Sequence, residues 1–342
     1  MKYLSIIIPS YNMENYLSRA ICSITVCRHL NDMEVIVVND GSKDGTSRIA
    51  HHYADQYAGN VIVIDKQNGN YGSCINAGLK VATAKYVKVL DADDYLHSDN
   101  LDSIVDMLDG TDADMLITPF CKVDTEGRTQ PSRHINLMPL NVYQVESLGN
   151  SKAILGIWMH EIIYRRQLLI DMGYRQTPGI GYTDMEWGFI PLLCVKTVEY
   201  IPSLLYYYQI GREGQSVDPA VHRRRYNEEI IVTRSMLQAL SQAETKHTSA
   251  AVRQLLVEKM MGRLKTIYRQ VLIVYQDDEN KELRELTDWM KHTLPDVFAR
   301  LMTLMLSTPL FPCPFIGWWY IGRHRRSLSY IASVYRKYKH LH

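Results

Sequence analysis

The sequence predicts a Rossmann-like α/β fold, in which helices flank a mostly parallel sheet and a helical extension follows toward the C-terminal end. Four short runs of apolar and β-branched residues recur before residue 97, and such runs indicate buried strands. Segments with the apolar spacing of helices lie between these runs. Because strands that alternate with helices form parallel sheets covered on both faces, this order predicts the fold class.

Each predicted strand ends in a short polar segment. In sheets of this kind a ligand lies beyond the carboxyl ends of the strands. We therefore expect the four polar segments to meet at one edge of the sheet and to form a binding site. The runs and the polar segments that follow them are 4–8 with 9–12, 34–38 with 39–42, 61–64 with 65–69, and 86–90 with 91–94.

The fourth polar segment holds three carboxylates, Asp91, Asp93 and Asp94. Charges at the end of a buried strand are costly to desolvate, so we expect them to face a cleft and a positive partner. Clustered carboxylate oxygens suit a hard divalent cation, Mg²⁺ or Mn²⁺, which itself can hold a diphosphate. The alternative is a solvated turn that is merely acidic.

Two other enzyme classes are excluded because the sequence lacks a required residue or motif of each. A phosphatase of the haloacid dehalogenase type has Thr two residues after the second Asp of D-x-D, where this chain has Tyr95. A dinucleotide-binding enzyme has G-x-G-x-x-G after the first strand, where residues 9–12 read Pro-Ser-Tyr-Asn. The sequence also contains no P-loop, no G-x-S-x-G and no H-E-x-x-H motif.

The composition is that of a globular protein. Apolar residues make up 46% and charged residues 22% of the 342 residues, and the net charge of +1 gives no reason to expect a nucleic-acid partner. The six cysteines are scattered without a C-x-x-C pair, so we expect neither a zinc site nor a disulfide framework. The reducing cytoplasm is the expected compartment. We expect the apolar run near residue 4 to be a strand, not a signal peptide.

Four motifs follow one another in this part of the chain: SIIIPSYN at 5–12, VIVVNDGSKDGT at 35–46, NAGL at 76–79 and LDADDYL at 90–96. In order and spacing they resemble the inverting glycosyltransferase family 2 throughout residues 3–96. The resemblance continues weakly to about residue 217 and does not cover the rest. It implies a GT-A fold and the transfer of a sugar from a nucleotide-diphosphate sugar.

The resemblance also implies a set of contacts to the nucleotide sugar. Tyr11 would stack on the base, with a packed surface Tyr as the alternative. Asp40 would accept a hydrogen bond from uracil; the alternative is a helix cap or Asx-turn, for which Asp44 and Thr46 are better candidates. Glu14 would reach the ribose, or else interact with a helix dipole. The implied set is Pro9, Tyr11, Glu14, Asp40, Asn68, Gly69, Asp91, Ala92 and Arg212, with Asp91 and Asp93 as metal ligands.

Three features bear on the diphosphate. The loop at 68–72 reads NGNYG, and its glycines let the backbone approach a ligand closely. Many relatives have Arg before the Asn of the NAGL motif, where this chain has Ile75, so a phosphate contact from that position is missing. Arg212 stands where relatives carry a loop that closes over the diphosphate.

A second acidic segment, GYTDMEWGF, occupies residues 181–189. In the family an acidic pair near this point begins a helix and supplies the general base, which removes the proton of the acceptor hydroxyl as it attacks the anomeric carbon. Asp184 matches the base position and Glu186 is the fallback, with a helix cap as the alternative role. Thr183 replaces the first acid of the pair. This departure keeps a second function class open, a non-catalytic homologue that binds sugar nucleotides.

Four regions are expected along the chain. They are a nucleotide-sugar-binding half at 1–114, an acceptor-binding half at 115–217, a helical extension at 218–296 and a basic, aromatic tail at 297–342.

Further elements are expected beyond the first half. We expect His160 to be packed or solvated, with substrate contact as the alternative. The sequence predicts strands at 115–120 and 204–209, a segment at 158–166 that turns back onto the sheet, and helices at 226–242, 250–275 and 281–292.

The tail at 297–342 has no Asp or Glu but seven Lys or Arg. Its uncharged stretch, 301–322, could just span a bilayer, but its prolines argue against one straight spanning helix. Trp318 and Trp319 precede the basic segment 323–326, and aromatic residues beside arginines are typical of an anionic membrane interface. We therefore expect an interfacial or re-entrant segment with both tryptophans in the interface. The alternative is a helical cap packed on the core.

We therefore expect an inverting, metal-dependent glycosyltransferase that moves one sugar from a UDP-linked donor to a lipid-linked or oligosaccharide acceptor in polysaccharide biosynthesis. The Q-x-x-R-W signature of processive synthases is absent, which favours transfer of a single sugar. The expected location is cytoplasmic and peripheral, on the cytoplasmic face of the membrane, with an anionic membrane surface as a partner.

Overall fold

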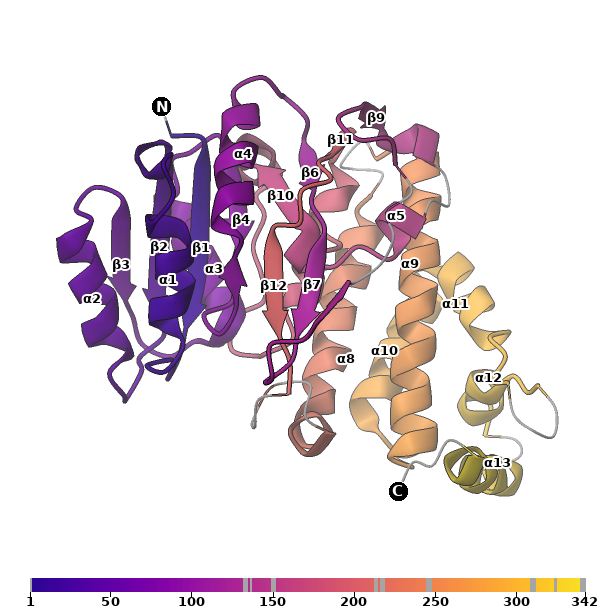
Figure 1. Ribbon diagram of the computed structural model, residues 1–342. Helices are drawn as coiled ribbons and strands as arrows, with labels where there is room; N and C mark the ends of the chain where they lie inside the picture. The colour runs from indigo at the N-terminus through magenta and orange to yellow at the C-terminus, as the bar shows by residue number, and fades with distance from the viewer. Residues whose placement is uncertain are drawn as a thin grey trace.

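The computed structural model has an eight-stranded mixed sheet at its centre, in the order β3-β2-β1-β4-β10-β6-β11-β9 (Figure 1). These strands are β1 (Leu4–Ser10), β2 (Met33–Asn39), β3 (Val61–Asp65), β4 (Tyr86–Val89), β6 (Met115–Ile117), β9 (Val142–Gln144), β10 (Ile162–Arg165) and β11 (Thr197–Tyr200). The structure describes residues 2–131, 135, 137–148, 152–211, 215, 219–243, 248–307, 312–322 and 325–338.

The four strands predicted first form the parallel part of this sheet. β1 pairs in parallel with β2 and β4, and β2 pairs in parallel with β3. Every residue of β1, β2 and β4 is buried, as expected for strands with helices on both faces. The predicted strands and their order are confirmed, and each end agrees to within two residues.

Helices cover both faces of the parallel part. Because successive side chains of a strand point to opposite faces, Ile6 and Ile8 pack in one cluster with Leu17, whereas Ile7 packs in the other with Ile75. Ile75 is fully buried, so this position supplies core packing. The helices are α1 (Leu17–Thr25), α2 (Thr46–Gln56), α3 (Asn70–Val81) and α4 (Ser98–Leu108).

The chain turns back onto the sheet at β10, as predicted. β10 lies between β4 and β6 and runs antiparallel to both, so the two halves of the chain share one sheet. β11 then adds parallel to β6, and β9 adds antiparallel to β11. Short helices connect these strands: η1 (Leu30–Asp32), η2 (Val145–Leu148), α5 (Lys152–Leu155), η3 (Met159–Glu161), α6 (Arg166–Asp171), α7 (Asp184–Trp187) and η4 (Pro191–Leu193).

A second sheet of four strands, in the order β5-β12-β7-β8, lies over the end of β4 (Figure 1). The prediction of one strand at 115–120 is wrong, because the chain leaves the large sheet at Thr118-Pro119 and enters the small one. Pro119 has no N–H to continue a ladder, which explains the break. The strand predicted at 204–209 begins at Tyr206. The strands are β5 (Tyr95–Leu96), β7 (Phe120–Val123), β8 (Thr129–Pro131) and β12 (Tyr206–Gln209).

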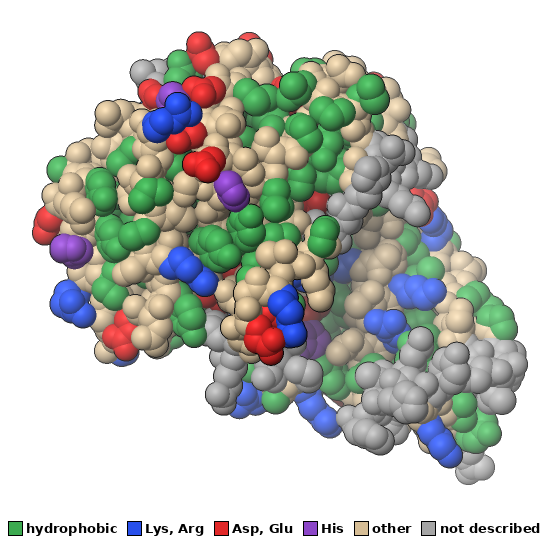
Figure 2. Space-filling view, viewed as in Figure 1, with side chains coloured by type: hydrophobic (Ala, Val, Ile, Leu, Met, Phe, Trp, Pro, Cys, Tyr) green, Lys and Arg blue, Asp and Glu red, His purple; other side chains and the backbone are tan. Residues whose placement is uncertain are grey.

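The helical extension packs beside the large sheet and shares its core (Figure 1). The three predicted helices are confirmed, although the second changes to a π-helix after Arg269. Lys and Arg side chains are spread over its visible face (Figure 2). The elements are α8 (Pro219–Ser241), α9 (Ala250–Arg269), the π-helix η6 (Gln270–Val274), α10 (Lys281–Thr293), α11 (Pro295–Met302), α12 (Phe315–Tyr320) and α13 (Arg325–Tyr338).

The aromatic part of the tail packs inward. Trp319 is only 4% exposed, its indole N–H donates to the Asp278 carbonyl at 2.6 Å, and the Arg284 guanidinium lies over its ring. The expectation that Trp319 lies in a membrane interface is therefore wrong, and α12 is a helical cap on the core. Within the described part of the chain no helix is both long and apolar enough to cross a membrane. Arg323 lies outside the described residues.

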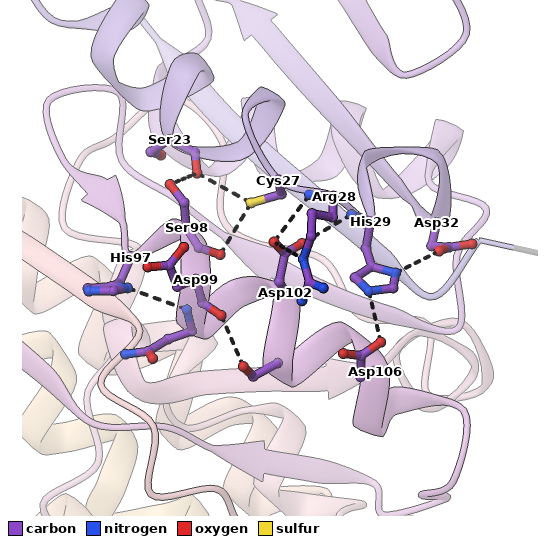
Figure 3. Close-up of polar contacts among 12 residues, drawn as sticks. Ser23, Cys27, Arg28, His29, Asp32, His97, Ser98, Asp99, Asp102 and Asp106 are labelled. Atoms are coloured by element: carbon purple, nitrogen blue, oxygen red, sulfur yellow. Dashed lines mark hydrogen bonds and ion pairs between the residues drawn. The ribbon is translucent and has the colours of Figure 1, made fainter.

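One buried carboxylate ties α1 to α4 (Figure 3). Asp102 accepts hydrogen bonds from the backbone N–H groups of Arg28 and His29, at 3.1 and 3.0 Å. His29 in turn contacts the carboxylates of Asp32 and Asp106. Burial raises the pKa of Asp102, but the hydrogen bonds from His29 and Arg28 outweigh it, so the pKa lies below its usual value. The ionised carboxylate therefore fixes the end of α1.

Candidate active site

The acidic segment after β4 is held from three sides. Tyr71 of α3 donates its hydroxyl hydrogen bond to Asp91 Oδ1 at 2.7 Å. Tyr206 of β12 donates to Asp94 Oδ2 at 2.6 Å, and the Gln209 N–H donates to Asp94 Oδ1 at 2.7 Å. Asp94 therefore orients the turn by joining the ends of β4 and β12.

The carboxylates of this segment repel one another in a poorly solvated place. Burial and then the charge of Asp93 raise the pKa of Asp91 to about 7, and the charge of Asp184 adds to this rise. Burial and the charges of Asp91 and Asp93 raise the pKa of Asp94 well above its usual value. Such a site has excess negative charge that a cation would neutralise.

His160 of η3 joins this cluster. One of its ring nitrogens and a carboxylate oxygen from each of Asp91 and Asp94 lie within 4.8 Å of one another, and oxygen and imidazole donors together fit a divalent cation. Asp93 is not a member of this group, although its charge acts on Asp91. The assignment of Asp93 as a metal ligand stays a prediction.

The imidazole of His160 is neutral. Burial, together with the charges of Lys88 and Lys122, lowers the pKa of His160 to about 3. Lys88 is a fully buried lysine of β4 whose Nζ donates to the His160 carbonyl at 2.8 Å. Burial lowers the pKa of Lys88 to about 7, against the opposing charge of Glu161.

The two acidic residues of α7 have different environments. Glu186 is fully buried and accepts hydrogen bonds from the Thr177 N–H at 2.7 Å and the Thr177 hydroxyl at 2.6 Å. Asp184 is half-buried, and its charge reaches Asp91. Burial raises the pKa of Asp184, while the charge of Arg263 from α9 opposes this rise. Glu186 therefore has a structural role, and Asp184 is the carboxylate of α7 whose charge acts on the acidic segment.

α3 fixes the backbone that leads to α7. The Asn76 side chain donates to the Gln176 carbonyl at 2.8 Å and accepts from the Gln176 N–H at 2.9 Å. Gly72, one turn earlier, lies so close that a Cβ there would stand 2.3 Å from the Thr177 carbonyl oxygen. Glu186 holds the N–H of the same Thr177.

Asp40 lies at the tip of β2, beside the loop that follows β3. Its Oδ1 contacts the Lys66 ammonium and accepts from the Gly69 N–H at 3.0 Å. The Asn68 side chain donates to the Asp40 carbonyl at 3.0 Å. The ends of β2 and β3 therefore lie together, as predicted. The Asn39 side chain at the end of β2 donates to Asp65 at the end of β3 at 2.6 Å.

The loops after β1 and β2 are joined by side-chain to backbone hydrogen bonds. Glu14 accepts from the Gly45 N–H at 2.7 Å, and Asp44 accepts from the Thr46 N–H at 3.0 Å at the start of α2. The N-cap position of α2 is Gly45, which makes no side-chain cap hydrogen bond, so the prediction that Asp44 or Thr46 is the cap residue is wrong, although Asp44 holds the first N–H of the helix. Glu14 contacts a helix start in this structure, and its ribose contact stays a prediction.

The remaining predicted contacts lie along the same edge. Tyr11 is 45% exposed beyond β1, where its ring is available for stacking, whereas Pro9 and Ala92 are buried at the ends of their strands. Arg212 lies outside the described residues.

Sequence comparison identifies the family. The sequence model of glycosyl transferase family 2 matches residues 5–173. EpsJ, an uncharacterized glycosyltransferase of Bacillus subtilis strain 168, is 32% identical over 168 residues, which cover 48% of this chain and 48% of EpsJ. Residues 5–173 belong to glycosyl transferase family 2. The chain thus spans about half the length of EpsJ.

Other relatives of the family-2 region agree. GgaB, a minor teichoic acid biosynthesis protein of B. subtilis strain 168, is 35% identical over 126 residues, or 36% of this chain and 14% of GgaB. The crystal structure of S. aureus TarS 1–349 in complex with UDP-GlcNAc matches with a TM-score of 0.73 and 22% identity, covering 99% of this chain and 92% of that one. The match to TarS shows the GT-A fold, including the helical region after the family-2 match.

Several residues of the family-2 site were missed in the sequence. Tyr71 and Tyr206 contact the acidic segment, and the charge of Arg263 acts on Asp184. These residues come from three separate elements, so only the fold brings them to the carboxylates. Lys88 could have been recognised in the sequence. A lysine inside an apolar run either ends the buried strand or is itself buried beside a hydrogen-bonding partner.

Proposed function

We propose that this chain is an inverting, metal-dependent glycosyltransferase that moves one sugar from a UDP-linked donor to a lipid-linked or oligosaccharide acceptor. The observation that supports the proposal is that the charge of Asp184 acts on Asp91 of the acidic segment, in a chain whose residues 5–173 match family 2. In this proposal residues 1–114 bind the donor and residues 115–217 bind the acceptor.

The donor end supports a uridine nucleotide. Tyr11 would stack on the base, and Asp40, held by Lys66 and Gly69, would accept from it. Because Asp40 is fixed before the ligand arrives, little side-chain freedom is lost on binding. The TarS structure with UDP-GlcNAc makes that compound the first donor to test.

The chemistry would divide between two groups of carboxylates. Asp184 would take the proton of the acceptor hydroxyl, which makes the oxygen a better nucleophile for the anomeric carbon. Attack from the side opposite the departing diphosphate inverts the configuration. A divalent metal bound at Asp91, with Asp93 or Asp94, would neutralise charge on that diphosphate. Tyr71 and Tyr206 would keep these carboxylates in place.

The acceptor is proposed to be part of a cell-surface polymer pathway. This proposal is supported by the similarity to GgaB, which is named for minor teichoic acid biosynthesis. We propose that the basic tail brings the enzyme to an anionic membrane surface on the cytoplasmic side, where such an acceptor would be held.

A donor screen tests the proposal. Full-length protein is incubated with a panel of nucleotide sugars and Mn²⁺, and thermal stabilisation and release of nucleoside diphosphate are measured. We expect stabilisation by UDP and its sugars and slow hydrolysis of one donor. Stabilisation without hydrolysis or transfer to any acceptor would favour the non-catalytic homologue, and no response to any nucleotide would contradict both readings.

A further inference from the structure

His160 occupies an unusual position for a histidine. It is only 5% exposed, and its ring packs against Tyr208 and Phe120 with centroids 4.6 and 5.0 Å away. Its Nδ1 is buried and has no hydrogen-bond partner among the residues that the structure describes. A buried ring nitrogen without a partner is costly, so this side chain requires an explanation beyond packing.

The surroundings of His160 supply one. A ring nitrogen of His160 and carboxylate oxygens of Asp91 and Asp94 lie within 4.8 Å of one another. Tyr71 fixes Asp91, and Tyr206 fixes Asp94. One atom of each of two oriented carboxylates and one imidazole therefore lie close enough together to bind the same cation.

The ring of His160 is positioned through its backbone. Lys88 donates to the His160 carbonyl at 2.8 Å, and the Thr118 N–H donates to the next carbonyl, that of Glu161, at 2.8 Å. The Glu161 side chain accepts from the Trp158 N–H at 2.8 Å and closes the short helix η3. Because these contacts fix the ring without using Nδ1, the imidazole is available to bind a ligand.

We propose that His160 is a direct ligand of the divalent metal, completing a set of two carboxylates and one imidazole with Asp91 and Asp94. This inference rests on the proposed function for the presence of a divalent metal. The proposed histidine ligand also predicts which metal the site binds. Mg²⁺ prefers oxygen ligands, whereas a nitrogen ligand favours Mn²⁺, so the site is expected to select Mn²⁺ over Mg²⁺.

Electron spin echo spectroscopy of bound Mn²⁺ tests the proposal, because it detects a nitrogen nucleus coordinated to the metal. Full-length protein is loaded with Mn²⁺, with and without UDP. We expect ¹⁴N modulation of imidazole type in the wild-type protein, which changes to the ¹⁵N pattern when the histidines are ¹⁵N-labelled. This measurement needs neither a known acceptor nor catalytic turnover.

Two variants assign the signal. His160→Phe keeps an aromatic ring for packing but has no ligand atom, so the ¹⁴N modulation should disappear and the Mn²⁺ affinity should fall by roughly tenfold or more. His52→Phe, the same change on the exposed face of α2, should leave both unchanged. Circular dichroism checks that each variant is folded.

The outcomes separate this inference from the proposed function. If Mn²⁺ binds wild-type protein but shows no ¹⁴N modulation, His160 is not a metal ligand. This result would not contradict metal-dependent transfer. Modulation that survives in folded His160→Phe assigns the nitrogen to another residue and also overturns it. Wild-type protein that binds no Mn²⁺ even with UDP contradicts the metal dependence itself.

Discussion

Asp184 and Glu186 are two residues apart on one short helix, yet their surroundings differ. Glu186 accepts two hydrogen bonds from Thr177 in a fully buried place, whereas Asp184 is half-buried and its charge acts on Asp91. The spacing of the two acids in the sequence does not reveal this difference. The difference arises because Glu186 contacts Thr177, which belongs to the segment that Asn76 of α3 holds in place.

Removal of the base is the sharpest residue-scale prediction. Asp184→Asn keeps the shape of the side chain but loses the proton acceptor, so transfer should fall by roughly two to four orders of magnitude. UDP affinity should change little, because the base serves the acceptor side. Transfer assays and calorimetric titration of UDP provide the two measurements.

Glu186→Gln is the matched control for that change. It weakens the contacts to Thr177, so the main expected effect is a loss of stability of roughly 1–3 kcal/mol, measured by denaturant unfolding. A folded Asp184→Asn variant with near-normal transfer would remove Asp184 from the mechanism.

The acidic segment allows a prediction of how UDP binding depends on the metal. If Asp93 contacts the metal in addition to the set of Asp91, Asp94 and His160, UDP should bind much more tightly with Mn²⁺ than with chelator, and Asp93→Ala should remove most of that difference. Asp94→Asn should be milder, because the remaining oxygen and the turn contacts to Tyr206 persist in part. Equal UDP binding in Mn²⁺ and in chelator would contradict the assignment.

Part of this site could be predicted from the sequence because it is local. Asp91, Asp93 and Asp94 follow a strand directly, and strand ends are visible in an apolar pattern. Tyr206 and His160 reach the same place from more distant parts of the chain, through the pairing of β12 and the return of β10. The sequence predicts the return of residues 158–166 onto the sheet, but no local pattern encodes which strands pair. The approach of His160 and Tyr206 to the acidic segment could therefore not be predicted.

At the scale of elements, the charge of the helical extension acts on Asp184, the proposed base. The charge of Arg263 on α9 opposes the rise that burial causes in the pKa of Asp184. A base works only when deprotonated, so activity should increase as the pH rises through that pKa. Arg263→Met removes the opposing charge and raises the pKa further. The acid limb of the pH–rate profile should therefore move to higher pH.

Arg263→Lys is the control for this prediction, since it keeps the charge. It should bring the acid limb back toward its wild-type position, which loss of packing alone would not do. The Arg263 guanidinium also contacts Thr233 at 2.9 Å, so stability is measured in parallel. An unchanged acid limb in folded Arg263→Met would show that the extension does not tune the base.

The link between α1 and α4 predicts how stability depends on acid. Asp102 has a pKa below its usual value, so its contribution is present above the ordinary Asp pKa of about 4 and is lost as the pH falls through the lower folded value. Asp102→Asn should cost roughly 1–3 kcal/mol near pH 7 and less at pH 2. Urea unfolding at both pH values measures this difference. An equal loss at both would mean that the charge does not contribute.

Elements were predicted well where burial is uniform and poorly where the chain changes sheets. Three of the four parallel strands, β1, β2 and β4, are buried on both faces, so their apolar runs are easily seen, whereas the edge strand β3 is only partly buried. The run at 115–120 is equally apolar, but its two ends belong to different sheets. The hydrophobic pattern indicates that residues 115–117 and Phe120 are buried, but it does not indicate which sheet each of them joins.

At the scale of the whole molecule, the tail combines a packed cap with a basic end. Trp319 is inside the fold, so any apolar contact with a membrane must come from exposed residues such as Ile321 and Tyr330. The packing of this tail could not be predicted, because an apolar, acid-free segment suits a protein core and a membrane interface equally.

Membrane docking is predicted to depend mainly on charge. The protein should sediment with anionic vesicles and be partly released by high salt, because each basic residue near the surface contributes on the order of 1 kcal/mol. Changing Arg323, Arg325 and Arg326 to Gln should weaken the binding without reducing UDP affinity.

The control for docking makes the same change of charge elsewhere. Lys80, Arg175 and Lys196 are exposed on other surfaces, and changing them to Gln should leave vesicle binding nearly unchanged. Wild-type protein that ignores anionic vesicles at low salt would show that the tail is only a cap.

The close approach of Gly72 to Thr177 limits how this enzyme can be recombined with its relatives. A chimera with the first 96 residues of another family-2 chain would inherit a new α3, and any side chain at the position of Gly72 would push against Thr177. Since Glu186 ties Thr177 to α7, that push would reach Asp184. We therefore expect this part of the chain to be exchangeable only between chains that keep glycine there and asparagine at the position of Asn76. A designer who wishes to replace it should begin with these two positions.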